Sequence, residues 1–257
     1  MRITILAAQA KIGLVLLLGH CIAAQAVEVK VIAGAAFAPA LAELGIQYER
    51  ATGHKLAIQY GIAGTIERLV AGGEGFDLTI LGADLMDAAV KHGRIAAGTR
   101  TEIARVGMAV AARAGVPKPD ISSVDAFKRA LLDAKSITYP PEGAVGIHLV
   151  KVLDRLGIAE QIKAKTEPQQ TVERVPESVA AGDAELGFAP TTVLLSVAGV
   201  QLIGPFPPEL QRYIVYTTGI GAAAKQPEAA EALVRYLTTV NAAALMTAKG
   251  FEPIAKK

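Results

Sequence analysis

Cysteine and tryptophan are the scarcest residues of this sequence. Among 257 residues there are one cysteine, Cys21, and no tryptophan, and aromatic residues make up only 5%. Cys21 lies in an amino-terminal segment that we expect to be removed, so the mature chain would have no disulfide, no thiol nucleophile and no cysteine metal ligand. Sugar-binding sites usually stack their ligands on aromatic rings, so this composition argues against a carbohydrate ligand.

The first 26 residues have the pattern of a secretory signal peptide. Arg2 and Lys11 make the start basic, residues 12–19 form a short apolar run, and small residues precede Val27, where we expect cleavage. The apolar run is shorter than the ~20 residues that a membrane-spanning helix needs. We therefore predict a cleaved signal peptide over residues 1–26 and a soluble periplasmic protein.

The sequence also has no marked excess of charge of either sign. The whole chain has a formal charge of +2, and loss of Arg2 and Lys11 with the signal peptide would leave 24 basic and 24 acidic residues. Binding to a phosphate backbone needs clustered lysine and arginine, so this balance argues against nucleic acid as a partner. We expect the mature protein to be a monomer that does not bind nucleic acid.

Motifs of common enzymes are absent as well. No G-x-S-x-G, H-E-x-x-H or P-loop motif occurs, and His54, His92 and His148 lie far apart without the carboxylates of a metal site. Asp77 and Asp84 could be taken as a catalytic carboxylate pair, but a residue at the start of a strand and a helix N-cap are the simpler interpretation. We therefore expect no catalysis, no cofactor and no metal.

The sequence does contain a regular alternation of short apolar strands and amphipathic helices. This alternation predicts an α/β fold with a largely parallel sheet. The predicted strands are 27–33, 55–61, 77–81, 136–139, 184–189 and 200–204. The predicted helices run from Phe37 to about Gly53, from Thr65, from Asp84, over 122–134, from Leu149 to Gly157, and around Ala230 to Leu237.

Two long extended runs, 102–115 and 213–225, bracket the middle of the chain. We interpret them as paired strands that cross between two lobes. Lobe 1 would consist of residues 27–107 and 217–257, and lobe 2 of residues 108–216.

Three glycines interrupt these runs, namely Gly107, Gly219 and Gly221. They could absorb the backbone changes of a hinge, because glycine tolerates angles that other residues avoid. They could equally mark bulges or close packing of strands.

Four turns between a strand and the next helix are rich in glycine, alanine or proline: 33–36, 60–65, 139–146 and 188–192. In open α/β sheets such turns gather at the carboxyl ends of the strands, where ligands bind. A helix start has unpaired amide groups and a partial positive charge, so it can hold an anion without any side chain. The pattern predicts a small anionic ligand in a cleft between the lobes, although short packed connections are the alternative.

Several segments resemble the periplasmic molybdate-binding proteins of ABC importers. They are VIAGAAFAPALAEL near the start, residues 60–84, residues 143–158 and KGFEP at 249–253, and the similarity covers nearly the whole mature chain. The resemblance implies a two-lobed type II periplasmic binding protein fold, with a mixed, mostly parallel sheet flanked by helices in each lobe and two crossing strands between them. It also implies a membrane permease of an ABC importer as partner.

The resemblance further implies a set of ligand positions. Proteins of that family close on a tetrahedral oxyanion through main-chain amides, two serine hydroxyls and a tyrosine hydroxyl. The serine positions fall on Ala36 and Ala63, the tyrosine position on Pro190, and the two amide positions on Val145 and Val172. All three hydroxyls are therefore missing, and each hydrogen bond to a charged group contributes roughly 1.5 to 3 kcal/mol.

Other residues of the same turns complete the predicted site. Threonines could replace the missing hydroxyls, or the pocket enlarged by alanine could hold a small organic acid with help from Arg68 or His148. The ligand thus stays open between a molybdate-type or tungstate-type oxyanion and an organic acid. A ligand-sensing domain and an enzyme acting on a small acid are the alternative functions. The remaining candidate residues are Gly64, Thr65, Gly146, His148, Thr191 and Thr192.

Overall fold

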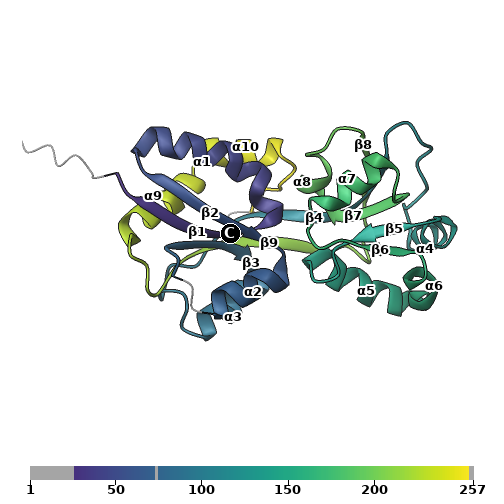
Figure 1. Cartoon of the computed structure of the whole chain (residues 1–257), viewed down its shortest axis with the longest axis horizontal. Coiled ribbons are helices and arrows are strands. Elements are labelled where there is room, and N and C mark those ends of the chain that lie inside the picture. The colour runs from purple at the N-terminus through teal and green to yellow at the C-terminus, as the bar shows by residue number, and fades with distance from the viewer. Residues whose placement is uncertain (1–25, 73–74, 255–257) are drawn as a thin grey trace, which may run out of the picture.

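The computed structural model describes residues 26–72 and 75–254, so the predicted signal peptide lies outside the described residues except for Ala26. These residues form two lobes that are joined by long strands (Figure 1). The predicted two-lobed type II periplasmic binding protein fold is confirmed, with mostly parallel sheets flanked by helices. The division at residues 107/108 and 216/217 stays a prediction.

Most elements alternate along the chain as the sequence pattern predicts, but the helices Ala159–Lys163, Arg174–Ala181 and Val240–Ala248 were not predicted. The strands are β1 (Glu28–Gly34), β2 (Lys55–Gly61), β3 (Leu78–Gly82), β4 (Thr101–Arg113), β5 (Ile137–Tyr139), β6 (Thr166–Pro168), β7 (Leu186–Pro190), β8 (Val200–Pro205) and β9 (Tyr213–Ile220). The helices are the 3-10 helix η1 (Ala35–Phe37), α1 (Ala38–Thr52), α2 (Ala63–Ala71), α3 (Ala83–Lys91), α4 (Val124–Asp133), α5 (Ala144–Leu156), α6 (Ala159–Lys163), α7 (Arg174–Ala181), α8 (Thr191–Leu194), α9 (Pro227–Leu237) and α10 (Val240–Ala248).

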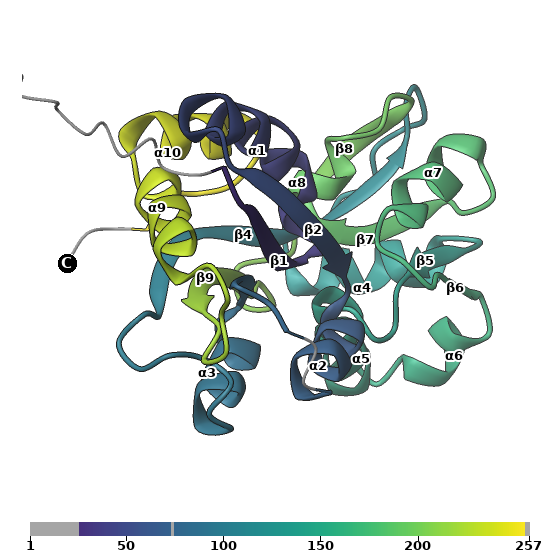
Figure 2. The ribbon, with the colours of Figure 1, turned by 60° about the vertical axis from the view of Figure 1, so that its left-hand side comes forward.

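The strand order is β2-β1-β3-β9-β4-β7-β5-β6, and β8 pairs with β4. In the first lobe β1 runs parallel to β2 and β3, and in the second lobe β5 runs parallel to β6 and β7. The antiparallel pair of β4 and β9 lies between these groups, with Arg105 opposite Val215. The two predicted crossing strands are therefore present, and they connect the lobes (Figures 1 and 2).

Helix α1 shows why the sequence periodicity predicts the fold locally. Leu41, Leu44 and Tyr48 recur on one face of the helix and are buried. The Tyr48 hydroxyl donates a hydrogen bond to the carbonyl of Ala229 on α9 at 2.9 Å. The helix ends at Gly53, whose φ of 78° is readily adopted only by glycine. The predicted helix boundary is confirmed.

Asp77 has a different role from that of the simple strand-start residue expected from the sequence. Its side chain is buried, and its carboxylate accepts hydrogen bonds from the amides of Lys30, Lys225 and Gln226 at 2.8, 2.7 and 2.8 Å. Lys30 lies on β1, and Gln226 is the N-cap of α9. One carboxylate thus joins segments that are far apart in the sequence.

The glycines of the crossing strands are closely packed. A Cβ added to Gly221 would lie 2.3 Å from the carbonyl oxygen of Phe76, and one added to Gly219 would lie 2.8 Å from Sδ of Met86. Both distances are shorter than real Cβ contacts, so no larger residue fits without a shift. The structure therefore favours close packing at Gly219 and Gly221 over a hinge role.

The hydrophobic core does not stop at the border between the lobes. One cluster extends from Phe37 and Leu41 of the first lobe to Val175 on α7 and Val193 on α8. A second cluster, around Phe127, Phe188 and Phe206, fills the second lobe.

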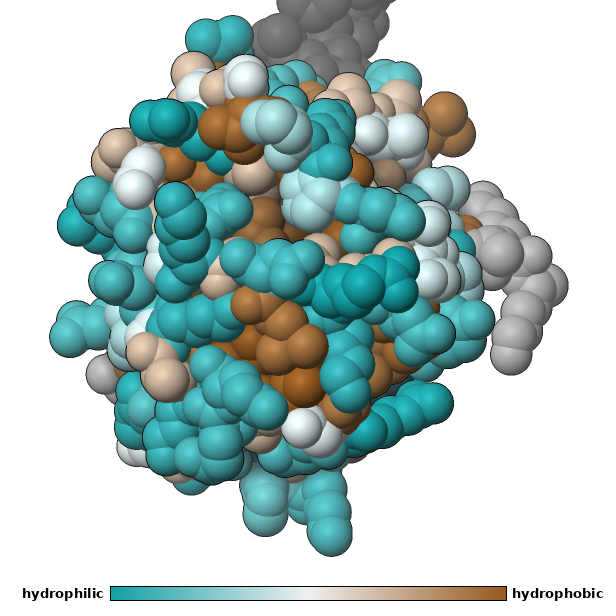
Figure 3. All heavy atoms as spheres, turned by 90° about the vertical axis from the view of Figure 1, so that its right-hand side faces the viewer, coloured by the Kyte–Doolittle hydropathy of each residue, from teal (hydrophilic) through white to brown (hydrophobic). Residues whose placement is uncertain are grey.

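The outer end of the second lobe is mostly hydrophilic with a small apolar area near its centre (Figure 3). Within the described ranges, no helix combines the length and the apolar character that a membrane crossing requires.

Candidate ligand-binding site between the lobes

A cavity of about 280 Å³ lies between the two lobes. Its wall includes the carboxyl ends of β1, β2, β3 and β7 and the turn that follows β5. All four small-residue turns predicted from the sequence contribute to this wall, and a fifth turn, at Gly82 and Ala83, was not predicted. This placement follows the general rule that ligands of open α/β sheets bind at the carboxyl ends of the strands.

Three helices of at least nine residues begin at the cavity, namely α2, α3 and α5. Their N-caps are Ile62, Gly82 and Gly143, and no side chain caps them. Of the other helices, α4 and α10 are capped by the hydroxyls of Ser123 and Thr239, whereas α1, α6, α7 and α9 also lack a capping side chain. The helix starts at the cavity therefore leave main-chain donors without a capping side chain, as anion binding requires.

The amide of Gly64 is an exception among these donors. It donates a hydrogen bond to the carbonyl of Glu142 at 3.3 Å, which links α2 of the first lobe to the turn before α5 in the second. This amide thus joins the lobes in the structure.

The predicted site residues divide into two sets of five. The structure places the first set in the cavity wall, where all five of the positions implied by the family resemblance come together: Ala36, Ala63, Val145, Val172 and Pro190. The second set lies outside the wall: Gly64, Thr65, Gly146, His148 and Thr191. Direct ligand contact stays a prediction for both sets.

Two residues of the second set, His148 and Thr191, have side-chain partners within the protein. His148 Nε2 lies 2.7 Å from the carbonyl oxygen of Leu210, and its ring stacks on Phe206. The Thr191 hydroxyl donates a hydrogen bond to the carbonyl of Gly107 at 3.2 Å. Because these groups are already engaged, neither is free to replace a missing hydroxyl at the cavity.

Two further candidates make contacts between the lobes. The hydroxyl of Thr192 donates to the carbonyl of Ala36 at 2.9 Å. Arg68 Nη1 lies 3.4 Å from Oε2 of Glu142, rather than pairing with its neighbour Glu67. Both interactions help to hold the lobes together around the cavity.

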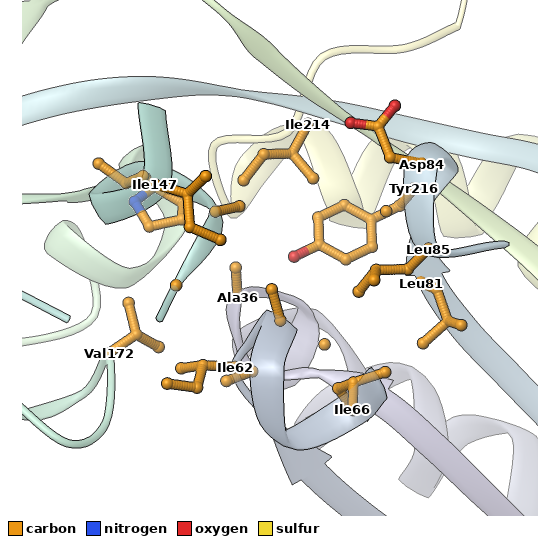
Figure 4. Close-up of a pocket in the computed structure, with 18 of the residues that line it drawn as sticks. Ala36, Ile62, Ile66, Leu81, Asp84, Leu85, Ile147, Val172, Ile214 and Tyr216 are labelled. Atoms are coloured by element: carbon orange, nitrogen blue, oxygen red, sulfur yellow. The ribbon is translucent and has the colours of Figure 1, made fainter. Parts of the chain in front are cut away.

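Apolar side chains form most of the remaining wall. Ile62, Ile66, Leu81, Leu85 and Ile214 surround the cavity (Figure 4). Aliphatic groups cannot hydrogen-bond an oxyanion, but they can cover the hydrocarbon part of an organic ligand. The site therefore combines donors at the helix starts with a hydrophobic enclosure.

Tyr216 is a candidate site residue that the sequence analysis missed. It lies on β9, its side chain is only 4% exposed, and its hydroxyl points into the cavity (Figure 4). Burial raises the pKa of this phenol far above its ordinary value. The alternation of Ile214 and Tyr216 along a strand was the available signal, because side chains two residues apart share one face.

One charged pair lies in the cavity wall. Asp84 on α3 and Arg212 from the second lobe form an ion pair. The predicted N-cap role of Asp84 is wrong, because Gly82 is the N-cap and Asp84 lies in the first turn. No group of three or more His, Cys, Asp or Glu residues among the described residues is suited to a metal ion.

Comparisons with known proteins agree with this architecture. Residues 29–252 match the family described as "Bacterial extracellular solute-binding protein". The chain is 33% identical over 218 residues to aconitate isomerase of a Pseudomonas species, covering 82% of each chain. It is 30% identical over 241 residues to the molybdate-binding protein ModA of Azotobacter vinelandii, covering 89% of this chain and 91% of ModA. The solved structure of the periplasmic molybdate-binding protein of A. vinelandii has a TM-score of 0.73 at 22% identity, covering 89% of this chain and 100% of that chain.

The chain therefore belongs to the family of bacterial extracellular solute-binding proteins. Its resemblance to the periplasmic molybdate-binding proteins is confirmed. Proteins of this kind bind a small ligand, are periplasmic and work with the permeases of ABC transporters.

Proposed function

We propose that this chain is the exported binding component of an ABC importer and captures a small organic carboxylate in the cavity between its lobes. The observation that carries the proposal is the combination in one cavity of three helix starts without capping side chains and an apolar wall. The amides would hold the carboxylate, and the aliphatic side chains would cover the rest of the acid. The monomeric state, the absence of catalysis and the absence of nucleic-acid binding remain parts of this proposal.

The dimensions of the cavity favour an organic acid over a tetrahedral oxyanion. Its volume is about 280 Å³. A five-atom oxyanion such as molybdate would fill only part of this space. It would also lack the hydroxyl contacts that Ala36, Ala63 and Pro190 cannot make.

Binding would be coupled to the relative position of the lobes. The cavity wall takes residues from both lobes, so a ligand makes its full set of contacts only when the lobes are closed. We infer that the lobes comprise residues 27–107 with 217–257 and residues 108–216. A decrease in the radius of gyration on ligand addition would support this coupling, whereas identical scattering profiles would contradict it.

A thermal-shift screen tests the ligand class. The protein is heated with molybdate, tungstate, sulfate, phosphate, butyrate, benzoate, fumarate or trans-aconitate. A ligand at a hundred times its dissociation constant should stabilise the folded state by ~2.7 kcal/mol. A shift with a carboxylate but not with molybdate supports the proposal. A shift with molybdate or tungstate alone would replace it by oxyanion transport.

A pair of variants tests the location of the site. Ala63→Glu places a negative charge at the first residue of α2, in the cavity wall. We expect it to abolish carboxylate binding, because the introduced carboxylate repels an anionic ligand and accepts the hydrogen bonds of the main-chain amides at the start of α2. Ala71→Glu, at the other end of the same helix, is the control and should retain binding. Equal binding by both variants would contradict the assignment of the site.

A second candidate function is isomerisation of an unsaturated carboxylic acid. Two observations favour it: the 33% identity to a protein named aconitate isomerase, and a carboxylate, Asp84, in the same cavity wall as the Tyr216 phenol. A carboxylate and a phenol are groups that can take and return a proton. Incubation with cis- or trans-aconitate, followed by NMR, tests this candidate with Asp84→Asn as the variant. If the wild-type protein interconverts the two isomers and Asp84→Asn does not, the chain is an enzyme. If the wild-type protein converts neither isomer, transport remains the function.

A further inference from the structure

The ring of Tyr216 is held firmly at the floor of the cavity. On β9 its backbone pairs with Gly82 on one side and Ala104 on the other. Its ring centroid lies 5.3 Å from that of Phe37 and 5.9 Å from that of Phe251, in tilted and edge-on arrangements. Aromatic contacts of this geometry restrict the ring to one orientation.

Gly34 provides the space that this ring occupies. A Cβ added to Gly34 would lie 2.9 Å from Cε1 and 3.1 Å from the hydroxyl oxygen of Tyr216. Gly34 is the last residue of β1 and belongs to one of the predicted ligand-binding turns. Because Gly34 has no side chain, the phenol ring of Tyr216 on β9 can pack against this turn.

The Tyr216 hydroxyl has no hydrogen-bond partner among the described residues, although the residue is only 4% exposed. In the described part of the chain every fully enclosed polar side-chain atom has a partner, so the unpaired Tyr216 hydroxyl is not fully enclosed by protein. The free hydroxyl is thus the one that faces the open cavity (Figure 4). Polar groups removed from bulk water normally find a partner, so this orientation points to a ligand atom.

Among the described residues of the wall, only one other has a hydroxyl group. Tyr213 is also in the cavity wall, but it is 38% exposed and its ring is covered by the Arg105 guanidinium at 4.4 Å. Tyr216 is therefore the buried hydroxyl of the site.

We infer that the Tyr216 hydroxyl donates a hydrogen bond to a carboxylate oxygen of the bound acid. This inference rests on the proposed function and deepens it, because it assigns the side-chain contact that the residues at positions 36, 63 and 190 do not provide. The phenol stays protonated at neutral pH, since burial raises its pKa. It is therefore a donor under the conditions in which the protein works, and a carboxylate is a strong acceptor.

Tyr216→Phe tests the inference, because it keeps the ring and removes only the hydroxyl. Tyr236→Phe is the matched control, since the Tyr236 hydroxyl donates to Gln47 on the surface of the first lobe. Calorimetric titration with butyrate, benzoate, fumarate and trans-aconitate measures the affinities. We expect Tyr216→Phe to weaken acid binding by about tenfold to a hundredfold and Tyr236→Phe to leave it unchanged.

Neutral analogues distinguish the hydrogen bond from a general effect on the cavity. Benzamide and butyramide keep the shape of benzoate and butyrate but lose the charge. Hydrogen bonds to charged acceptors are stronger than those to neutral ones, so the loss in Tyr216→Phe should be larger for the acids than for the amides. Equal losses for both would overturn the inference.

Gly34→Ala provides a second and independent variant. The added methyl group displaces the closely packed Tyr216 ring while the hydroxyl remains, so acid binding should again fall and the melting temperature should decrease as well. Wild-type affinity in Tyr216→Phe, or in Gly34→Ala if Tyr216→Phe does not fold, would overturn the inference and leave the proposed function intact. A wild-type protein that binds none of the four acids would overturn both.

Discussion

Arg68 and Glu142 form an ion pair between the lobes, with Nη1 of the arginine 3.4 Å from Oε2 of the glutamate. The side chains are 67% and 63% exposed. Asp84 and Arg212 form a second ion pair between the lobes, also at the surface. Exposed ion pairs contribute only ~0.2 to 1 kcal/mol each. The two pairs can therefore favour closure and still allow the lobes to separate and release a ligand.

Glu142→Ala should weaken the binding of benzoate by no more than about fivefold, because it removes one exposed ion pair of up to about 1 kcal/mol. The difference from wild type should shrink in 0.5 M salt, since salt screens such pairs. Titration at two salt concentrations measures both effects. Glu177→Ala, which breaks the Arg174–Glu177 pair on α7, is the control and should leave affinity unchanged. A loss above about tenfold would instead indicate direct ligand contact by Glu142.

Gly146→Ala should destabilise the fold. A Cβ at this position would lie 2.1 Å from the carbonyl oxygen of Pro140, so the turn before α5 must shift. Overpacking of this kind costs about 1 to 3 kcal/mol. Urea denaturation measures the loss, and Gly75→Ala, where an added Cβ meets open space, is the control. Equal stability of the two variants would show that the turn moves freely.

The position of Gly146 also changes how the turns can be tested. From the sequence alone, Gly146→Pro is expected to weaken binding with little loss of fold. The close contact with Pro140 makes Gly146 a packing residue, so any larger residue there disturbs the fold as well. A substitution in the cavity wall, such as Ala63→Glu, separates binding from stability better.

Asp77→Ala should lower the free energy of unfolding by about 3 kcal/mol or more, because three main-chain amides lose their acceptor at once. Asp87→Ala is the control, since Asp87 forms an exposed pair with Arg100 and its removal should cost under about 1 kcal/mol. Urea denaturation compares both with wild type. A loss in Asp77→Ala no larger than in the control would show that water replaces the carboxylate.

Glu49 should make stability depend on acidity. Its hydrogen bond from Lys55, with a second from the amide of Leu56, lowers the pKa of this carboxyl below its ordinary value of 4.5. A lowered folded-state pKa stabilises the protein above pH 4.5, and this contribution is lost as the pH falls through the folded-state pKa. Glu49→Gln should therefore cost up to about 1 kcal/mol at pH 7 and progressively less in acid. Denaturation at several pH values measures this, and a constant difference would contradict it. Glu67→Gln, at an exposed position on α2, is the control.

Local sequence patterns predicted most of the fold because strand and helix periods are local properties. All six strands predicted outside the crossing pair occur, with ends shifted by at most two residues. The strand β6 was missed because it is only three residues long and ends in proline at the edge of the sheet. The small-residue turns were also predictable, since their composition and their place before helices define them.

The side-chain partners of the site could not be predicted in the same way. His148 binds the carbonyl of Leu210, 62 residues away, and Arg68 pairs with Glu142, 74 residues away. Tyr216 was missed for a related reason. Strand alternation shows that Ile214 and Tyr216 share a face, but only the path of the crossing strand shows that this face meets the cavity.

The pair of strands β4 and β9, which both lobes share, determines how the molecule unfolds. Since each strand contributes hydrogen bonds to both sides of the junction, and apolar packing continues across it, we expect neither half to fold on its own. Expressing one half alone would leave an unpaired strand at the edge of the sheet and would expose hydrophobic side chains that are buried in the whole chain. The whole chain should consequently unfold in one cooperative step, with ligand protecting both halves equally.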